Sequence, residues 1–318
     1  MADTSIVIVA GPTASGKSAL ALALAEEFTG TIINADSQQV YRDLAVLTAR
    51  PTAAETARIP HALYGVIDAS ESCSAGRWLA LARGEISAAH AAGRVPILVG
   101  GSGLYLEALL RGLAELPPIA QDIRAEAHAL YAKLGGAAFR AALAELDPEA
   151  AARLPAGDAQ RLTRAYEVAR STGTSLSEWQ HRQPPLATLR VAALLLMPPR
   201  AALYAACDAR VERMVEAGAE AEAKALRARH LAPSTPAMKA VGVREFGALA
   251  EGRSTREQVV AAMQQATRNY AKRQYTWFRR RLPENESLSK LVIEAQFSER
   301  ILPESFSFIR SFLLTGQS

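Results

Sequence analysis

Residues 11–18 have the residue types and spacing of a loop that binds phosphate groups. They read G-P-T-A-S-G-K-S, which follows the pattern G-x-x-x-x-G-K-S. In this pattern the glycines let successive backbone N–H groups point at an anion, the lysine adds a mobile positive charge, and the serine hydroxyl can complete the shell of Mg²⁺. The sequence therefore predicts a di- or triphosphate site with Ser18 as the metal ligand. The predicted phosphate-binding residues are Gly11, Pro12, Thr13, Ala14, Ser15, Gly16, Lys17 and Ser18.

A single carboxylate is predicted to act beside this loop. Asp36 follows the β-branched run at 31–35, and ligands of parallel sheets bind where such strands end. There it could be the general base of a kinase acting on small alcohols or nucleosides, or of another group transferase. A turn or helix-capping aspartate is the alternative that its position leaves open. The apolar run at 95–99 ends in Gly100 rather than in an acid that would hold Mg²⁺, which disfavours simple ATP hydrolysis.

An α/β fold is predicted to position these residues. Short β-branched runs, expected to be strands, occur at 6–9, 31–35, 63–67, 95–99 and 189–197. Amphipathic stretches, expected to be helices, occur at 17–28, 75–92, 201–229 and 256–281. This alternation is typical of a P-loop NTPase-like parallel sheet flanked by helices.

The middle of the chain is predicted to form a separate helical part. From 117 to 185 the strand pattern disappears, and proline pairs at 117–118 and 184–185 mark the two ends. We therefore expect a catalytic core of residues 1–116 and 186–283, with an all-helical subdomain inserted at 117–185. Residues 284–318 carry no motif and are expected to form a C-terminal extension of unknown role, on the surface or loosely packed.

Composition and charge exclude some classes of protein. Of the 318 residues 49% are apolar, but no stretch approaches the about 18 uncharged apolar residues of a membrane span. Cys73 and Cys207 lack metal-type spacing, and the N-terminus lacks a leader pattern, which together predict a cytoplasmic protein. The net charge is +4, yet residues 267–281 hold six basic residues and no acid, which favours a polyanionic partner.

Five spaced blocks together resemble one known family. Besides the phosphate loop they are D-S-Q-Q-V-Y at 36–41, G-G-S-G-L-Y at 100–105, D-A-Q-R-L-T-R-A at 158–165 and R-V-E-R-M at 210–214. In this order they are similar to the tRNA dimethylallyltransferase (tRNA isopentenyltransferase, IPP transferase) family, over residues from about 5 to about 281. The resemblance implies a Mg²⁺-dependent monomer that transfers a dimethylallyl group from dimethylallyl pyrophosphate to tRNA. The acceptor would be the N6 amine of the adenosine immediately 3′ of the anticodon.

The resemblance also implies roles for individual residues. Asp36 would orient the adenine N6 and accept its proton, Thr13 would hydrogen-bond the bridging oxygen of the pyrophosphate, and Arg210 would reach the diphosphate. The helical insertion would close over the anticodon stem-loop, and Ser102 stands where many members carry threonine. The implied tRNA contacts are Asp36, Ser37, Gln38, Gln39, Ser102, Arg124, Gln160, Arg161, Leu162, Thr163 and Arg164.

Two alternatives stay open at the level of the sequence. A P-loop small-molecule or nucleoside kinase would share the phosphate loop and Asp36, but it would have no use for residues 160–164. The basic segment at 268–281 is either an amphipathic helix with Trp277 and Phe278 in the core or a surface for RNA phosphates. The RNA-facing residues would be Arg268, Lys272, Tyr275 and Arg279. Lys239 is assigned only a supporting role near the site.

Overall fold

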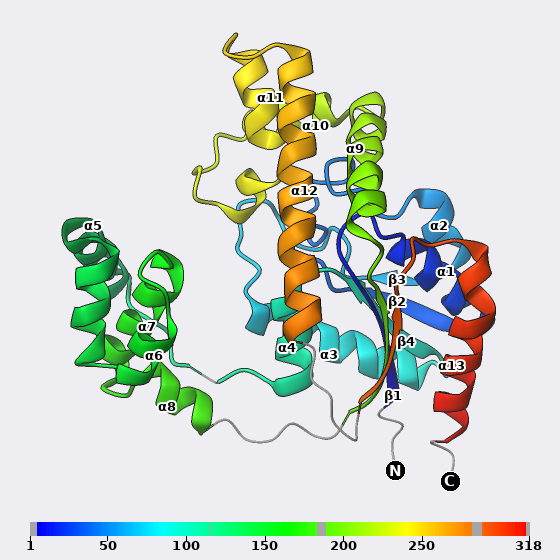
Figure 1. Cartoon of the computed structure of the whole chain (residues 1–318), viewed down its shortest axis with the longest axis horizontal. Coiled ribbons are helices and arrows are strands. Elements are labelled where there is room, and N and C mark those ends of the chain that lie inside the picture. Colours follow the sequence, from blue (N-terminus) through cyan, green and yellow to red (C-terminus); the bar gives the residue numbers. More distant parts are fainter. Residues whose placement is uncertain (1–4, 115, 183–188, 282–287, 316–318) are drawn as a thin grey trace. The chain divides into compact units, whose positions relative to one another are not determined.

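The computed structural model describes residues 5–114, 116–182, 189–281 and 288–315. The chain divides into two compact units (Figure 1). Unit 1 comprises Met1–Leu110 and Ala187–Ser318, and unit 2 comprises Arg111–Leu186. Each unit contains a hydrophobic cluster formed by its own residues, so the two are described separately.

Unit 1 is built on a parallel sheet that contains six strands within the described residues, in the order β3-β2-β4-β1-β5-β6. Their bounds are Ser5–Ala10 (β1), Gly30–Asn34 (β2), His61–Ala62 (β3), Val95–Gly100 (β4), Arg190–Leu196 (β5) and Leu288–Ile293 (β6). Val7 of β1 lies opposite Ile97 of β4 on one side and Ala192 of β5 on the other. β1 and β2 are buried along their whole length, as in parallel sheets with covered faces. The predicted α/β class is confirmed.

Helices flank this sheet and extend beyond it (Figure 1). α1 (Lys17–Glu27) and α13 (Leu302–Leu314) share one hydrophobic cluster with the strands, while α3 (Ala75–Ala91) packs against β2 and β4. The long helix α12 (Arg256–Arg281) packs along α9 (Arg200–Glu216). The remaining α-helices of this part are α2 (Ala53–Arg58), α4 (Gly103–Arg111), α10 (Ala219–Arg227) and α11 (Val243–Ala250). Within the described ranges, no helix combines the length and the apolar character needed to cross a membrane.

The C-terminal part of the chain belongs to the core, so the prediction of a surface or loosely packed extension at 284–318 is wrong. β6 adds to the sheet beside β5 with Leu194 opposite Leu291. Ile309 and Phe312 of α13 are buried in the same cluster as β1 and α1. The apolar run at 288–293 is short and carries no motif, so no strand could be predicted there from the sequence alone. Residues 282–287 lie outside the described part of this region.

Two other predicted elements differ from the structure. The run at 63–67 is not a strand, because Leu63 and Gly65 have φ values of +64° and +63°, which an extended strand does not allow. Only Ile67 forms an isolated bridge, to Tyr41. The stretch at 201–229, expected to be one helix, forms two helices. α9 ends at Glu216, and Gly218, with a φ of +98°, is the N-cap of α10.

Unit 2 is all-helical within the residues that the structure describes. Its helices are α5 (Gln121–Ala144), α6 (Pro148–Arg153), α7 (Ala159–Thr172) and α8 (Leu176–His181). Phe139, Leu143 and Leu162 belong to its hydrophobic core. The carboxylate of the buried Asp147 caps α6 through the N–H of Ala150, and it also accepts hydrogen bonds from the N–H and hydroxyl of Ser177. This capping joins α6 to α8.

Candidate active site

The phosphate loop connects β1 to α1 with a tightly bent backbone. Gly11 has a φ of +152°, and a Cβ there would lie 2.5 Å from the carbonyl oxygen of Leu196. Gly16 has a φ of +88° and is the N-cap of α1. Ala14 has a φ of +63° although it is not glycine, which costs about 1–2 kcal/mol for an L-residue. The surrounding structure thus keeps the loop in a strained backbone conformation. The loop lies at the N-terminus of α1, a position that favours the binding of anions.

Ser15 provides a direct sign that the loop accommodates a polar ligand. The residue is fully buried, and among the described residues its hydroxyl has no hydrogen-bond partner. An unpaired buried hydroxyl costs about 1–3 kcal/mol, so such groups in folded proteins call for an explanation. A phosphate oxygen in the loop would accept this hydrogen bond. The loop therefore fits the phosphate ligand predicted for it.

Lys17 is buried at the first position of α1. Its Nζ donates a long hydrogen bond of 3.4 Å to the carbonyl oxygen of Pro12. Burial lowers the pKa of the Lys17 ammonium group from 10.5 to about 8, while the charge of Asp36 raises this pKa and the charge of Arg210 lowers it. These three charged groups therefore lie close enough to influence one another. A diphosphate would add negative charge and stabilise the protonated lysine.

The lowered pKa of Lys17 predicts a pH-dependent affinity for inorganic pyrophosphate. Below pH 8 the free protein carries a protonated Lys17, and above its pKa of about 8 the proton is lost, so affinity should fall by up to about tenfold per pH unit. Isothermal titration calorimetry between pH 7 and pH 9.5 would measure this, with Lys17→Met as the control that removes the titrating group. Identical profiles for the two proteins would contradict the assignment.

The lowered pKa of Lys17 also determines whether the protein becomes more or less stable as the pH rises. The unfolded chain keeps the Lys17 proton up to pH 10.5, whereas the folded chain loses it near pH 8. The unfolded state binds more protons in this window. The titration of Lys17 should therefore increase the free energy of unfolding of the ligand-free protein as the pH rises from 8 to 10.5. Urea unfolding of the wild type and of Lys17→Met across this window would check the sign.

Asp36 lies in a tight turn directly after β2. Its Oδ1 accepts a hydrogen bond of 2.9 Å from the backbone N–H of Gln38. Asn34 holds the other side of the turn, because its side chain accepts from the N–H of Asp36 and donates to the carbonyl oxygen of the same residue. Asp36 is partly exposed, so its second oxygen can meet a ligand. The turn and the catalytic interpretations are thus compatible, because one carboxylate oxygen fixes the turn.

Most of the predicted site residues around Asp36 are engaged in hydrogen bonds within the protein. The hydroxyl of Ser102, at the start of α4, accepts a hydrogen bond of 2.8 Å from the N–H of Ser37. Gln39 donates to the carbonyl oxygens of Thr48 and Ala49. The predicted RNA-contacting residues Ser37, Gln39 and Ser102 therefore also position the Asp36 turn. Gln38 differs from them, because its side-chain oxygen is buried without a partner among the described residues.

Arg210 reaches this group from α9. Its Nη2 donates a hydrogen bond of 2.7 Å to the carbonyl oxygen of Thr48. Burial lowers the pKa of the Arg210 guanidinium, and the charge of Asp36 raises it. The structure therefore brings Lys17, Asp36 and Arg210 together from three distant parts of the sequence.

Gln274 is a site residue that the sequence did not reveal. It is buried in α12, and its side-chain oxygen accepts a hydrogen bond of 2.7 Å from the backbone N–H of Thr13. Its side-chain nitrogen donates one of 2.9 Å to the carbonyl oxygen of Gly101. One amide thus joins the phosphate loop to the glycine-rich segment after β4. A glutamine within a basic helix belongs to no motif, so only the contact across 261 positions identifies it.

Removal of this amide should weaken the phosphate site strongly. In Gln274→Leu the N–H of Thr13 and the carbonyl of Gly101 would stay buried and unpaired, and we expect the affinity for pyrophosphate to fall about 10- to 100-fold. Calorimetric titration measures the affinity, and a melting curve shows whether the variant is folded. Gln265→Leu, at an exposed position of the same helix, is the matched control. Unchanged affinity in folded Gln274→Leu would contradict the role.

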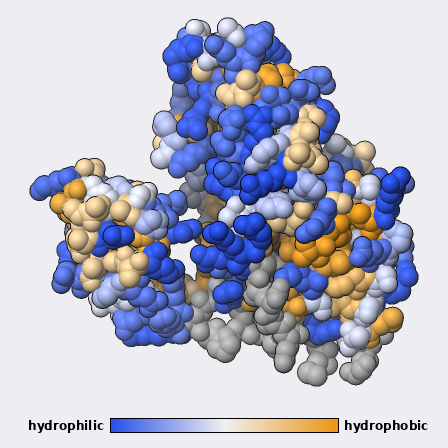
Figure 2. All heavy atoms as spheres, in the orientation of Figure 1, coloured by the Kyte–Doolittle hydropathy of each residue, from blue (hydrophilic) through white to orange (hydrophobic). Residues whose placement is uncertain are grey.

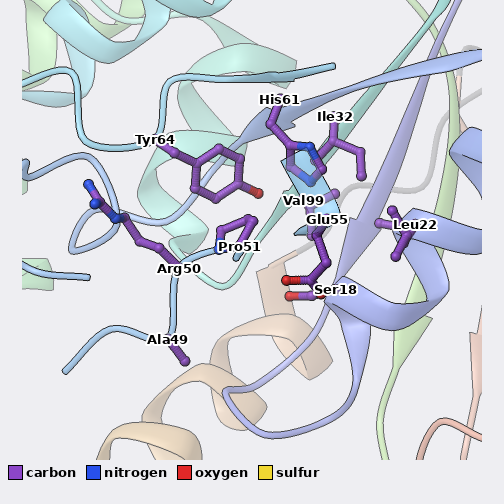
Figure 3. A pocket seen from close by; sticks show the side chains of 11 residues that line it. Ser18, Leu22, Ile32, Ala49, Arg50, Pro51, Glu55, His61, Tyr64 and Val99 are labelled. Carbon is purple, nitrogen blue, oxygen red and sulfur yellow. The ribbon is translucent and has the colours of Figure 1, made fainter. Parts of the chain in front are cut away.

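Ser18 borders a small cavity beside the phosphate loop. The cavity has a volume of about 50 Å³, and Figure 3 shows Ser18, Glu55, His61 and Tyr64 around it. Burial raises the pKa of the Tyr64 hydroxyl, as do the charges of Asp36 and Glu55. In the part of the chain that the structure describes, no group of three or more His, Cys, Asp or Glu side chains could hold a metal ion. A metal bound at Ser18 would thus need oxygen ligands from a substrate.

The C-terminal half of α12 combines a buried and a basic side. Phe278 is buried, and a Cβ at Gly103 would lie 2.3 Å from the Trp277 ring. Arg268 is paired with Asp208 at 2.6 Å. The basic residues that remain exposed are Lys272, Arg273, Arg279, Arg280 and Arg281, and the end of α12 forms a strongly hydrophilic area in Figure 2. The core role is therefore shown for Phe278, and the exposed cations leave a surface suited to phosphates.

The remaining predicted residues lie in unit 2. Arg124 is exposed in the first turn of α5, and Gln160 and Arg161 are exposed at the start of α7. Leu162 is fully buried in the core of this unit, which gives its side chain a packing role. The hydroxyl of Thr163 donates to the carbonyl oxygen of Ala159 within the helix. Arg164 is 3.3 Å from the carboxylate of Glu167.

Together the strained phosphate loop after β1, its buried lysine and the aspartate after β2 define a P-loop group-transfer enzyme. The model of the IPP transferase family matches residues 39–281. This chain belongs to the IPP transferase family.

Individual relatives agree with this assignment. The chain is 53% identical over 317 residues to the tRNA dimethylallyltransferase of Rhodospirillum rubrum, covering 98% of this chain and 96% of the relative. It is 49% identical over 305 residues to that of a Caulobacter species, covering 96% and 99%. The crystal structure of the full-length tRNA isopentenylpyrophosphate transferase of Bacillus halodurans matches with a TM-score of 0.69 and 32% identity, covering 98% of both chains. A eukaryotic dimethylallyltransferase acting on tRNA matches with a TM-score of 0.78 and 26% identity, covering 96% of this chain and 80% of that one.

Proposed function

We propose that this protein transfers the dimethylallyl group of dimethylallyl pyrophosphate to the N6 amine of the adenosine immediately 3′ of the anticodon in tRNA. The products are N6-(dimethylallyl)adenosine and pyrophosphate. The observation that carries the proposal is the grouping of Lys17, Arg210 and Asp36 at the phosphate loop, in a chain whose relatives are tRNA dimethylallyltransferases. Two cations suit a diphosphate leaving group, and the carboxylate suits an amine that must lose a proton.

In the proposed reaction the phosphate loop, Lys17 and Arg210 bind the diphosphate and stabilise the charge that develops as the bond from C1 to oxygen breaks. The hydroxyl of Thr13 hydrogen-bonds the bridging oxygen. The adenine N6 forms the new bond to C1, and its proton passes to the free oxygen of Asp36. Atoms and charge balance, because the amine loses one proton and the donor loses pyrophosphate.

Mg²⁺ is the proposed cofactor. When bound, it would neutralise charge on the leaving diphosphate. Ser18 is exposed at the start of α1 and would hold the ion through its hydroxyl oxygen. Mg²⁺ commonly takes few protein ligands and completes its shell with substrate phosphates and water, which agrees with the few protein donors at this position.

The proposed RNA contacts come from both units. In unit 1 they are the turn at Asp36–Gln39, Ser102 and the exposed cations of α12, and in unit 2 they are Arg124, Gln160, Arg161 and Arg164. The N6 of a stacked anticodon-loop adenine is accessible only when the base leaves its stack. The buried, unpaired side-chain oxygen of Gln38 is a candidate acceptor for such a base. Because its acceptor is tRNA, we expect the enzyme to act in the cytoplasm, as the monomer that the family resemblance implies.

The relatives support prenyl transfer over the kinase that the sequence left open, and one experiment distinguishes the two activities directly. Labelled dimethylallyl pyrophosphate and Mg²⁺ are offered to an unmodified anticodon stem-loop, beside a reaction with labelled ATP. The proposal predicts prenylated RNA with the label on the adenosine 3′ of the anticodon. Absence of prenyl transfer, with phosphate transfer from ATP to a small acceptor, would identify the kinase instead.

A further inference from the structure

The segment that follows β6 lies directly against the phosphate loop. The side-chain nitrogen of Gln296 donates a hydrogen bond to the carbonyl oxygen of Ala14. The backbone N–H of Phe297 donates one of 3.2 Å to the carbonyl oxygen of Ser15. A Cβ at Gly16 would lie 2.3 Å from the Cβ of Phe297. Three consecutive residues of the loop are thus contacted by two residues near the C-terminus.

This segment is itself anchored to the sheet. β6 pairs with β5 as far as Ile293, whose carbonyl oxygen also accepts a hydrogen bond of 2.8 Å from the N–H of Met197. Phe297 packs on the hydrophobic cluster that contains α1 and α13. The end of β5 contacts the loop too, through Leu196 beside Gly11. The segment therefore connects the phosphate loop to the sheet through direct contacts with both.

The contact acts where the loop is most strained. Ala14 has a left-handed φ of +63°, and its carbonyl group is the one that Gln296 binds. Without this hydrogen bond, Ala14 could relax toward the right-handed region, which would turn the adjoining peptide groups and disturb the anion site. The side-chain oxygen of Gln296 is buried and, among the described residues, unpaired, as is the hydroxyl of Ser15. The Ser15 hydroxyl belongs to the loop itself, and Gln296 contacts the loop residue that precedes it.

We propose that residues 296–297 hold the phosphate loop in its anion-binding conformation and that Gln296 is a positioning residue for the diphosphate. The inference rests on the proposed function only for the identity of the donor. The hydrogen bond from Gln296 to Ala14 maintains the strained carbonyl, and Phe297 covers the first turn of α1. The C-terminal segment is thus part of the donor site.

The test compares substitutions at position 296 in the full-length protein. Gln296→Met keeps the length and volume of the side chain but cannot donate a hydrogen bond, and Gln296→Glu keeps its shape and polarity but is ionised at neutral pH. Glu294→Gln, at an exposed position two residues earlier, is the matched control. Melting curves establish that each variant is folded, and titration with inorganic pyrophosphate and Mg²⁺ reports on the loop without needing prenyl transfer.

Both variants should bind pyrophosphate about tenfold more weakly than the wild type. Their KM for dimethylallyl pyrophosphate should rise by the same factor, with kcat and the KM for the RNA within about twofold, and Glu294→Gln should behave as wild type. Wild-type pyrophosphate affinity in folded Gln296→Met would overturn the proposal, because a side chain that only packs tolerates this exchange. If the wild type binds pyrophosphate but prenylates no RNA, the proposed function fails while the positioning role is still measured.

Discussion

Replacement of Asp36 by asparagine is expected to lower kcat for prenyl transfer by about 10²- to 10⁴-fold. Asparagine keeps the side-chain oxygen that binds the N–H of Gln38, so the turn after β2 should persist. It removes the negative charge that would accept the N6 proton. The affinity for the anticodon stem-loop should change far less, about twofold, because the remaining RNA contacts are untouched.

Single-turnover prenylation and a filter-binding assay with the stem-loop separate these two effects. Glu216→Gln, at the exposed end of α9 and outside the Asp36 turn, is the control that removes a carboxylate charge without touching this site. A variant whose RNA affinity falls as far as its turnover would show that Asp36 binds RNA and is not the base.

The second large effect is expected from Lys17→Ala. We expect kcat/KM for dimethylallyl pyrophosphate to fall about 10²- to 10³-fold, because a charged donor to the leaving diphosphate is lost from a buried position. The affinity for pyrophosphate should fall with it. RNA affinity should stay near the wild-type value, since the Lys17 side chain is buried and is assigned to the diphosphate, not to the RNA.

Steady-state kinetics with varied donor and calorimetry with pyrophosphate measure both quantities. Lys224→Ala, at an exposed position of α10, removes the same charge from the molecule far from the loop and should behave as wild type. If the two alanine variants lose donor affinity equally, the effect is one of net charge, and the loop is not the diphosphate site.

The parts of the site that the sequence predicts are those that local chemistry determines. The phosphate loop is specified by Gly11, Gly16 and Lys17, whose roles depend on backbone freedom and one charge within eight positions. Asp36 could be placed because parallel strands end at one edge of the sheet, whatever their order. The role of Arg210 at the diphosphate could be predicted only from the family resemblance, because no local sequence feature distinguishes it from other arginines in helices.

The parts that the sequence did not predict depend on contacts between distant positions. Gln274 and Gln296 are separated from their partners in the loop by 261 and 282 positions, and neither lies in a motif. β6 is short and partly exposed, so its apolar pattern is weak until β5 lies beside it. Leu162 was expected at the RNA because it lies within a conspicuous block, yet the helical period turns it into the core of unit 2.

The strand order also has a consequence for biosynthesis. β1 leaves the ribosome first but occupies the middle of the finished sheet, and Ile8 must wait for Leu98 and then for Ala193. At translation rates of about 5–20 residues per second, its second neighbour arrives roughly 10–40 s after it. Throughout that time at least one edge of this apolar strand stays unpaired in the nascent chain, and the phosphate loop after it lacks its supports. Chaperone demand should therefore be highest during synthesis, and premature termination before β6 should yield chains that aggregate rather than chains with partial activity.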